Sequence, residues 1–142
     1  MGLFLPLRRA TLLVPSGPQA DQSRKHLFVL LTDPCPEVDD GEKSVLLVSL
    51  STVRDRIPHD STCVLHPDDH PFVRNISYVV YQRARIEAAN KLLEGVKQGL
   101  LVPQATVEPG VFARICKGLE ESRLTPPRYV NFYRRATGMD SR

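Results

Sequence analysis

The strongest constraint on the fold is a change in hydrophobic period at about residue 85. Before it, short runs rich in Val, Leu, Ile and aromatic residues are separated by clusters of Pro, Gly and Asp, as in strands and turns. After it, apolar residues recur every three or four positions, as on one face of an amphipathic helix. Several short strands with no helix between them indicate a small antiparallel barrel, and the later pattern adds helices.

The predicted elements follow this division. Strands are expected at residues 10–14, 26–32, 44–53, 62–66 and 76–82. A first helix carries apolar residues at Ile86, Ala89, Leu93 and Val96. A second helix begins near Pro109, and Pro126-Pro127 separates it from a last helix over residues 129–135. The predicted fold class is therefore α+β, mainly β: a small antiparallel barrel followed by C-terminal helices.

The 142 residues are enough for a single domain with one core. We expect residues 1–22 to form an N-terminal extension that can hold a strand, residues 23–85 the barrel, and residues 86–142 the helical region. The apolar runs are far shorter than the roughly 20 residues of a membrane-spanning helix. The three cysteines lie far apart and form neither a C-x-x-C pair nor an even disulfide set. These features predict a cytoplasmic protein with no membrane partner.

The formal net charge of +3 is too small to define a partner, but the charge is unevenly distributed. Residues 33–69 hold nine acids and three bases, and residues 112–142 hold seven bases and three acids. Tyr129, Phe132 and Tyr133 are interleaved with the C-terminal bases. Such a segment either binds RNA or an acidic protein, or forms an amphipathic helix that buries its aromatic rings against the barrel. We favour the buried helix.

Three segments, in this order along the chain, carry a resemblance to a known family. They are residues 25–33 (KHLFVLLTD), 44–52 (SVLLVSLST) and 77–86 (SYVVYQRARI). Together with the loop 69–72 (DHPF), they resemble a divergent branch of the MazF/PemK (Kid/CcdB-type) toxin family. The resemblance covers roughly residues 25 to 95, and each of its motifs is short.

That family has an SH3-like barrel, so the resemblance implies such a barrel here. Its toxins cleave single-stranded RNA without a metal, act as homodimers and are neutralised by an antitoxin. The resemblance therefore implies RNA as the substrate, an antitoxin and a second copy of the chain as partners, and no cofactor. Cleavage through the ribose 2′-hydroxyl needs a base, an acid, and a cation that holds the phosphate.

The best candidate cluster for this chemistry lies at the start of the second predicted strand. His26 offers an imidazole that exchanges a proton near neutral pH, and it follows the phosphate-binding cations Arg24 and Lys25. His70, in the Pro-rich loop before the last strand, is a second imidazole for proton transfer. In the alternative reading, the ring of His26 is hydrogen-bonded to the backbone and the two cations are solvated.

Hydroxyl groups at the end of the third strand add to the predicted site. Ser51 and Thr52 precede Arg54, where they can bind phosphate oxygens. In the alternative reading, these hydroxyls form a turn by bonding to their own backbone.

The last predicted strand supplies further RNA-binding candidates. Period-two alternation places Ser77, Tyr81, Arg83 and Arg85 on one face. On that face a base can stack on Tyr81 while Arg83 meets phosphate. In the alternative reading, Tyr81 lies at the edge of the core.

Histidine is a common metal ligand, and His59, His66 and His70 are therefore also candidates for a metal site. His66 and His70 have the i, i+4 spacing that places two ligands on one helix face. Pro67 and Pro71 make this segment a loop, however, so the helical geometry does not hold. We therefore predict no metal site.

The chain is thus predicted to be a toxin-like endoribonuclease of a type II toxin–antitoxin system. The predicted catalytic residues are Lys25, His26, Ser51 and His70. The predicted RNA-binding residues are Arg24, Thr52, Arg54, Ser77, Tyr81 and Arg83. Lys25-His26 stand where the family has Arg-Pro, which motivates an alternative function: a non-catalytic SH3-like module that binds protein or nucleic acid.

Overall fold

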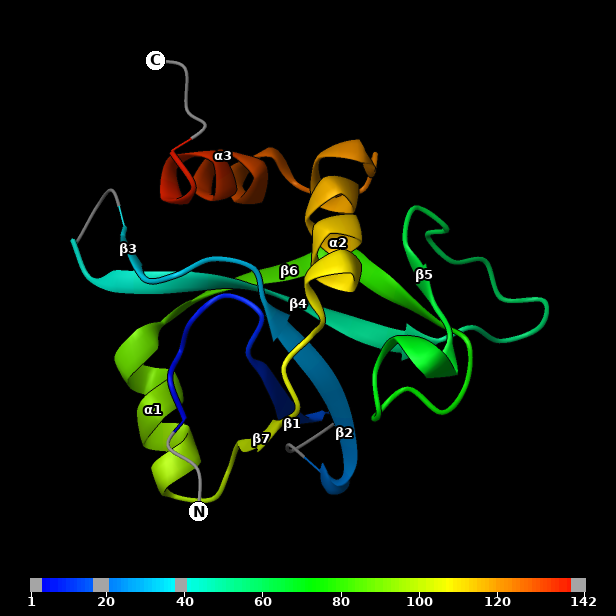
Figure 1. Ribbon diagram of the computed structural model, residues 1–142, viewed down its shortest axis with the longest axis horizontal. Coiled ribbons are helices and arrows are strands. Elements are labelled where there is room, and N and C mark those ends of the chain that lie inside the picture. Colours follow the sequence, from blue (N-terminus) through cyan, green and yellow to red (C-terminus); the bar gives the residue numbers. More distant parts are fainter. Residues whose placement is uncertain (1–3, 17–20, 38–40, 139–142) are drawn as a thin grey trace.

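The computed structural model describes residues 4–16, 21–37 and 41–138, and these residues form one antiparallel sheet of seven strands (Figure 1). The strands are β1 (Thr11–Ser16), β2 (Asp21–Leu30), β3 (Cys35–Pro36), β4 (Lys43–Thr52), β5 (Val64–Leu65), β6 (Ser77–Ala88) and β7 (Val102–Gln104). Their order is β5-β6-β4-β2-β1-β7, and β3 pairs with β4. The helices are α1 (Ala89–Lys97), α2 (Pro109–Glu121) and α3 (Pro127–Ala136).

The sheet curls into a half-barrel, and α2 and α3 follow it in the sequence (Figure 1). The predicted class, α+β and mainly β with C-terminal helices, is confirmed, and α2 begins at Pro109 as predicted. The first helix begins later than predicted, because Ile86 pairs with Leu46 in the sheet and α1 starts at Ala89. The chain then returns to the sheet through β7, which pairs with β1. The sheet therefore includes strands on both sides of residues 23–85.

The two faces of the sheet bury separate hydrophobic clusters. Figure 1 shows α2 and α3 on one face and α1 on the other. Successive side chains of β2 point to opposite faces of the sheet, so β2 contributes residues to both clusters. Leu27 and Val29 pack in the α2/α3 cluster, whereas Phe28 and Leu30 pack with Leu92 of α1. Full burial of each such side chain stabilises the fold by about 1.5–3 kcal/mol.

An insertion in β6 changes which of its side chains share a face. One residue of β4, Val48, lies opposite four residues of β6, 81–84. Before the insertion, Tyr81 packs in the α2/α3 cluster. After it, Arg85 lies over the ring of Phe28, which belongs to the opposite face. The prediction that Tyr81, Arg83 and Arg85 share one face is therefore wrong, because period-two alternation holds only while the pairing register is unbroken.

The basic C-terminal segment packs on the sheet as α3. Phe132 is buried, and Tyr129 and Tyr133 pack partly buried against the same cluster. Two of the arginines also contact the rest of the fold, since Arg134 Nε lies 2.8 Å from Glu120 and Arg128 lies 3.9 Å from Glu37. The preferred reading of this segment as a packed amphipathic helix is confirmed.

The loop between β4 and β5 is tied to the end of α2 by Asp60. Its Oδ2 accepts a hydrogen bond from the Ser122 hydroxyl (2.6 Å), and its Oδ1 accepts bonds from the N–H and hydroxyl of Thr62 (3.0 and 2.6 Å). Burial acts to raise the pKa of Asp60, but the bonds from Ser122 and Thr62 outweigh it and lower the pKa.

We expect Ser122→Ala to destabilise the fold by about 1 kcal/mol at neutral pH, because it removes the hydrogen bond to Asp60. A carboxyl whose folded-state pKa is depressed stabilises the fold above its unfolded-state pKa and loses that contribution as the pH falls through the folded-state value. The difference between wild type and Ser122→Ala in urea unfolding should therefore shrink below about pH 4. A difference that stays constant into the acid range would contradict this role of Asp60.

Candidate nucleic-acid interface

β2 and β4 are paired over only three positions, from Phe28 opposite Ser49 to Leu30 opposite Leu47. Beyond these positions β2 continues to pair with β1 on its other edge, and β4 continues to pair with β6 on its other edge, but β2 and β4 no longer pair with each other, so the two strands diverge. A cavity of about 650 Å³ lies at this divergence, and we call it the cation cavity. Consecutive residues of both strands line it, because a gap between strands is open to side chains from both faces.

The cation cavity brings together most of the predicted site. Its lining includes Lys25, His26, Ser51, Thr52, Arg54 and Ser77. The loop before β6 adds Phe72, Arg74 and Asn75. The sequence pattern does not identify Phe72 and Asn75 as residues of the site, because the position of a loop side chain depends on the tertiary fold. Arg24 is in β2, and its side chain is outside the described residues.

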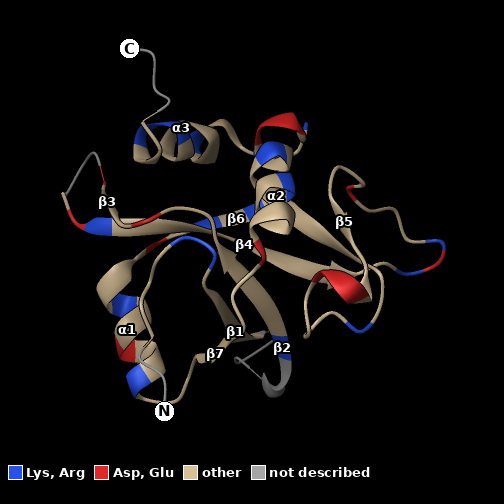
Figure 2. Cartoon of the chain, viewed as in Figure 1, with Lys and Arg blue, Asp and Glu red and all other residues tan. Residues whose placement is uncertain are grey.

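Three exposed cations, Lys25, Arg54 and Arg74, line the cation cavity, and none of the lining residues whose side chains the structure describes is a carboxylate. Among the side chains that the structure describes, those of residues 4–15, 25–37 and 41–138, none of the three forms an ion pair. Figure 2 shows a basic segment of β2 at this end of the sheet. Cations without carboxylate partners are available to bind an anion such as a phosphate.

His26 bridges the two diverging strands. Its Nδ1 lies 3.2 Å from the backbone oxygen of Leu50 on β4. A carbonyl oxygen only accepts hydrogen bonds, so Nδ1 is the protonated nitrogen and the neutral ring keeps a lone pair on Nε2. Nε2 has no hydrogen-bond partner in the described part of the chain. The backbone-bonded reading of His26 is confirmed, and the same contact leaves one nitrogen able to take a proton.

The hydroxyl groups of the cation cavity differ in their environment. Those of Ser51 and Thr52 are half-buried and have no hydrogen-bond partner among the residues described, so the expected backbone turn is absent there. The Ser77 hydroxyl is buried and donates to the backbone oxygen of Asn75 (2.9 Å). Ser51 and Thr52 are therefore the hydroxyls free to donate to an anion.

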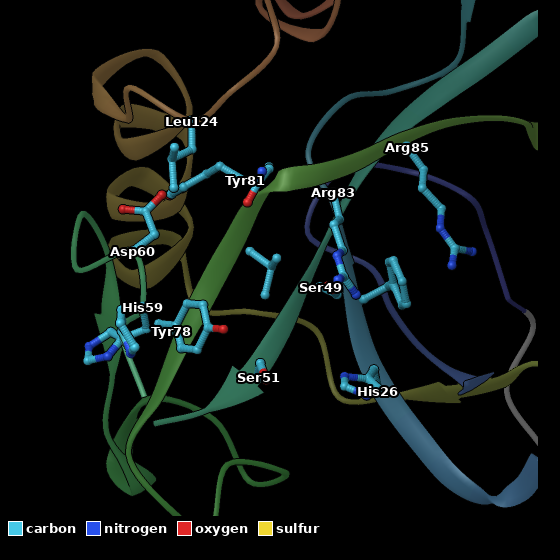
Figure 3. Close-up of a pocket in the computed structure, with 14 residues that line it drawn as sticks. His26, Ser49, Ser51, His59, Asp60, Tyr78, Tyr81, Arg83, Arg85 and Leu124 are labelled. Carbon is cyan, nitrogen blue, oxygen red and sulfur yellow. The ribbon is translucent and has the colours of Figure 1, made fainter. Parts of the chain in front are cut away.

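A second cavity, of about 470 Å³, adjoins the first and shares His26 and Ser51 with it (Figure 3). We call it the Tyr78 cavity. Other residues that line it include Phe28, Ser49, His59, Asp60, Tyr78, Val80, Gln82, Arg83 and Arg85. Arg83 therefore lies in this second cavity and not in the cation cavity.

His70 has a structural place in the fold. Its ring is 4% exposed, and Nε2 lies 2.6 Å from the backbone oxygen of Ala105. Nδ1 accepts a hydrogen bond from the N–H of Phe72 (3.0 Å), so Nε2 carries the proton. No ring nitrogen remains for a substrate, and the prediction that His70 transfers protons is wrong. The ring instead fixes the loop that carries Phe72 and Arg74.

Tyr81 is part of the core. The residue is 0% exposed, and its hydroxyl donates to the backbone oxygen of Ile115 in α2 (2.7 Å). Burial raises the pKa of this hydroxyl above its ordinary value. The prediction that a base stacks on Tyr81 is therefore wrong, because a ligand cannot reach the ring.

Other features that could carry chemistry are a metal site, His59 and the two buried thiols, Cys63 and Cys116. No group of three or more His, Cys, Asp or Glu is placed to hold a metal ion among the residues described. His59 packs beside Tyr78, with 5.1 Å between the ring centroids. Burial raises the pKa of the Cys63 and Cys116 thiols, which keeps them protonated and unreactive.

Comparisons of the chain with known protein families, with curated proteins and with solved structures find no match. The two cavities and the residues that line them are therefore the features that bear on function. In the described ranges, no helix has the length and apolar character needed to cross a membrane.

Proposed function

We propose that this chain is a metal-independent endoribonuclease of the MazF/PemK type that binds single-stranded RNA at the cation cavity. One observation carries the proposal: a gap between two strands gathers three cations, two free hydroxyls and an imidazole with an available nitrogen, and the described part of its lining holds no carboxylate. Toxicity to the host cell, an antitoxin partner and a homodimer belong to the same proposal.

The cations determine how the substrate binds. Lys25 on β2, Arg54 after β4 and Arg74 before β6 surround one cavity from three segments of the chain. Each carries a full positive charge at neutral pH, and guanidinium groups bind phosphate oxygens in two-bond geometry. Ser51 and Thr52 donate further hydrogen bonds to the same phosphate.

His26 and Lys25 carry out the proton transfers in this proposal. Nε2 of His26 takes the proton of the ribose 2′-hydroxyl, and the 2′-oxygen forms a bond to phosphorus. The bond from phosphorus to the 5′-oxygen breaks, and the Lys25 ammonium gives that oxygen a proton. The products are a 2′,3′-cyclic phosphate and a 5′-hydroxyl end, and the neighbouring arginines stabilise the charge that develops on the phosphate.

We expect the purified chain to cut single-stranded RNA in the presence of a chelator, and His26→Asn to slow this cutting by about 10²–10⁴-fold. Asparagine keeps an N–H near the position of Nδ1, so it can retain the hydrogen bond to Leu50, but it cannot take a proton. Cleavage rates of end-labelled RNA, with identification of the new ends, provide the measurement. Arg123→Ala is the matched control, because Arg123 is exposed and lines neither cavity.

A second candidate function is the non-catalytic binding module. It is favoured by the position of His70, because both ring nitrogens of His70 are bonded within the fold. His26 is then the only imidazole among the described lining residues of the cation cavity, and no second imidazole is present among them to act as an acid. RNA that is bound by the wild-type chain but never cut would establish this second candidate. Failure to bind or cut any of a varied set of single-stranded RNAs would contradict the endoribonuclease and the RNA-binding form of the module.

A further inference from the structure

The Tyr78 cavity has the composition of a site for a flat aromatic ligand. Tyr78 and His59 form one wall, and their ring planes are inclined by 39°. At another side, the guanidinium carbon of Arg85 lies 4.7 Å from the centre of the Phe28 ring. Figure 3 shows the Tyr78 ring projecting from β6, with Ser51 and His26 below it and Arg83 across from it.

The electrostatics of this cavity favour an anionic chain. Arg83 and Arg85 are exposed on its rim, and neither forms an ion pair with any residue that the structure describes. Asp60 is the one acid among the described residues of the lining, and both of its oxygens accept hydrogen bonds, from Ser122 and Thr62. Its carboxylate is therefore held within the fold, and the two exposed arginines outnumber it, so the net charge of the described lining is positive.

The volume and the position of the Tyr78 cavity also fit one unit of a polymer. About 470 Å³ lies within the range of about 300–1,000 Å³ that is typical of small-ligand sites. The cavity meets the cation cavity at His26 and Ser51, which line both. If a ligand binds with its phosphate at this junction, the part of the ligand attached to that phosphate therefore lies in the Tyr78 cavity.

We propose that the Tyr78 cavity is a nucleobase subsite, in which the base beside the bound phosphate stacks on Tyr78; this inference rests on the proposed function. The exposed amide of Gln82 offers both a donor and an acceptor to the base edge. A base can enter such a cavity only when it is unpaired and turned out of its stack. The substrate class is therefore RNA with an unpaired base directly beside the cleaved phosphate.

The test uses single-stranded RNA decamers that carry one abasic nucleotide at successive positions, with the His26→Asn chain so that the RNA stays intact. We expect one position at which loss of the base lowers the affinity about 5- to 150-fold, the range for loss of one stacked base. Tyr78→Ala should lower the affinity for the intact decamer by a similar factor and abolish the effect of that position. Tyr78→Phe, which keeps the ring, should restore most of the affinity.

The outcomes separate this inference from the proposed function. If every abasic decamer binds as tightly as the intact one while binding still depends on Lys25, the base subsite is overturned and the proposed function stands. If one position matters equally with and without Tyr78→Ala, both in the His26→Asn chain, the base binds elsewhere and the inference is also overturned. If no decamer binds at all, both the inference and the proposed function fail. The abasic series does not require that Tyr78→Ala folds, and circular dichroism checks that variant.

Discussion

Gly118→Ala is expected to lower the free energy of unfolding by about 3 kcal/mol or more. A Cβ atom on Gly118 would overlap the hydroxyl of Tyr81 and would lie 2.8 Å from the ring carbon that carries it. The Tyr81 ring is fully buried, and its hydroxyl is bonded to the backbone oxygen of Ile115. The ring therefore cannot move aside without breaking that bond, and the costs of overpacking and of an unpaired buried hydroxyl add together.

The same contact explains why glycine occupies this position in α2. Without a side chain at Gly118, the helix can approach β6 closely enough for Tyr81 to reach the backbone of the helix. Tyr81 lies only three positions after Tyr78 on the same strand. We therefore expect Gly118→Ala to disturb the candidate interface as well as the core.

Urea unfolding of four variants tests this prediction. Gly110→Ala is the matched control in the same helix, since a Cβ there meets nothing within 4 Å, and we expect little loss of stability. Tyr81→Phe alone should cost about 1 kcal/mol through its lost hydrogen bond. In the double variant the cost of Gly118→Ala should be smaller, because the overlapping hydroxyl is gone, although the ring carbon remains close. Strictly additive costs would show that the two residues do not compete for space.

Arg54→Ala/Arg74→Ala is expected to weaken RNA binding at least about tenfold and to flatten its salt dependence. Each phosphate contact with a single strand contributes about 0.7 to the slope of log K against log salt, so the loss of two contacts should reduce the slope by about 1.4. The reason is that fewer counterions are released when the RNA binds. Titrations of labelled single-stranded RNA at several salt concentrations measure both quantities.

The matched control for this variant is Lys97→Ala/Arg123→Ala. It removes the same charge from exposed positions that line neither cavity. The control should leave the salt slope unchanged and the affinity within about twofold. Equal effects of the two double variants would show that net charge, and not the cation cavity, attracts the RNA.

Much of the fold could be predicted because its signals are local. The alternating apolar runs marked the strands, and the proline at position 109 marked the start of α2. The start of α1 could not be read in the same way. Ile86 has the spacing of a helical face, yet pairing with Leu46 keeps it in β6, because tertiary contacts override local propensity.

The candidate site could be predicted only in part. Lys25, His26 and Ser51 were predicted from their chemistry at strand ends and from a resemblance to a family, and the structure places them in one cavity. His70 has the chemistry of a proton carrier, but its two nitrogens are bonded to backbone groups of Phe72 and Ala105. The contact with Ala105, 35 positions away, has no trace in the local pattern.

Periodicity along the chain predicted which segments form strands and helices and most of their order, since these patterns depend on near neighbours. The sequence also identified the residues with suitable chemistry. The separation of Tyr81 and Arg85 onto opposite faces depended on Val48 facing four residues of β6. The cation cavity likewise exists because the pairing of β2 with β4 ends at Phe28 opposite Ser49. Both features come from pairing between distant strands, whose register is set by packing of the whole sheet.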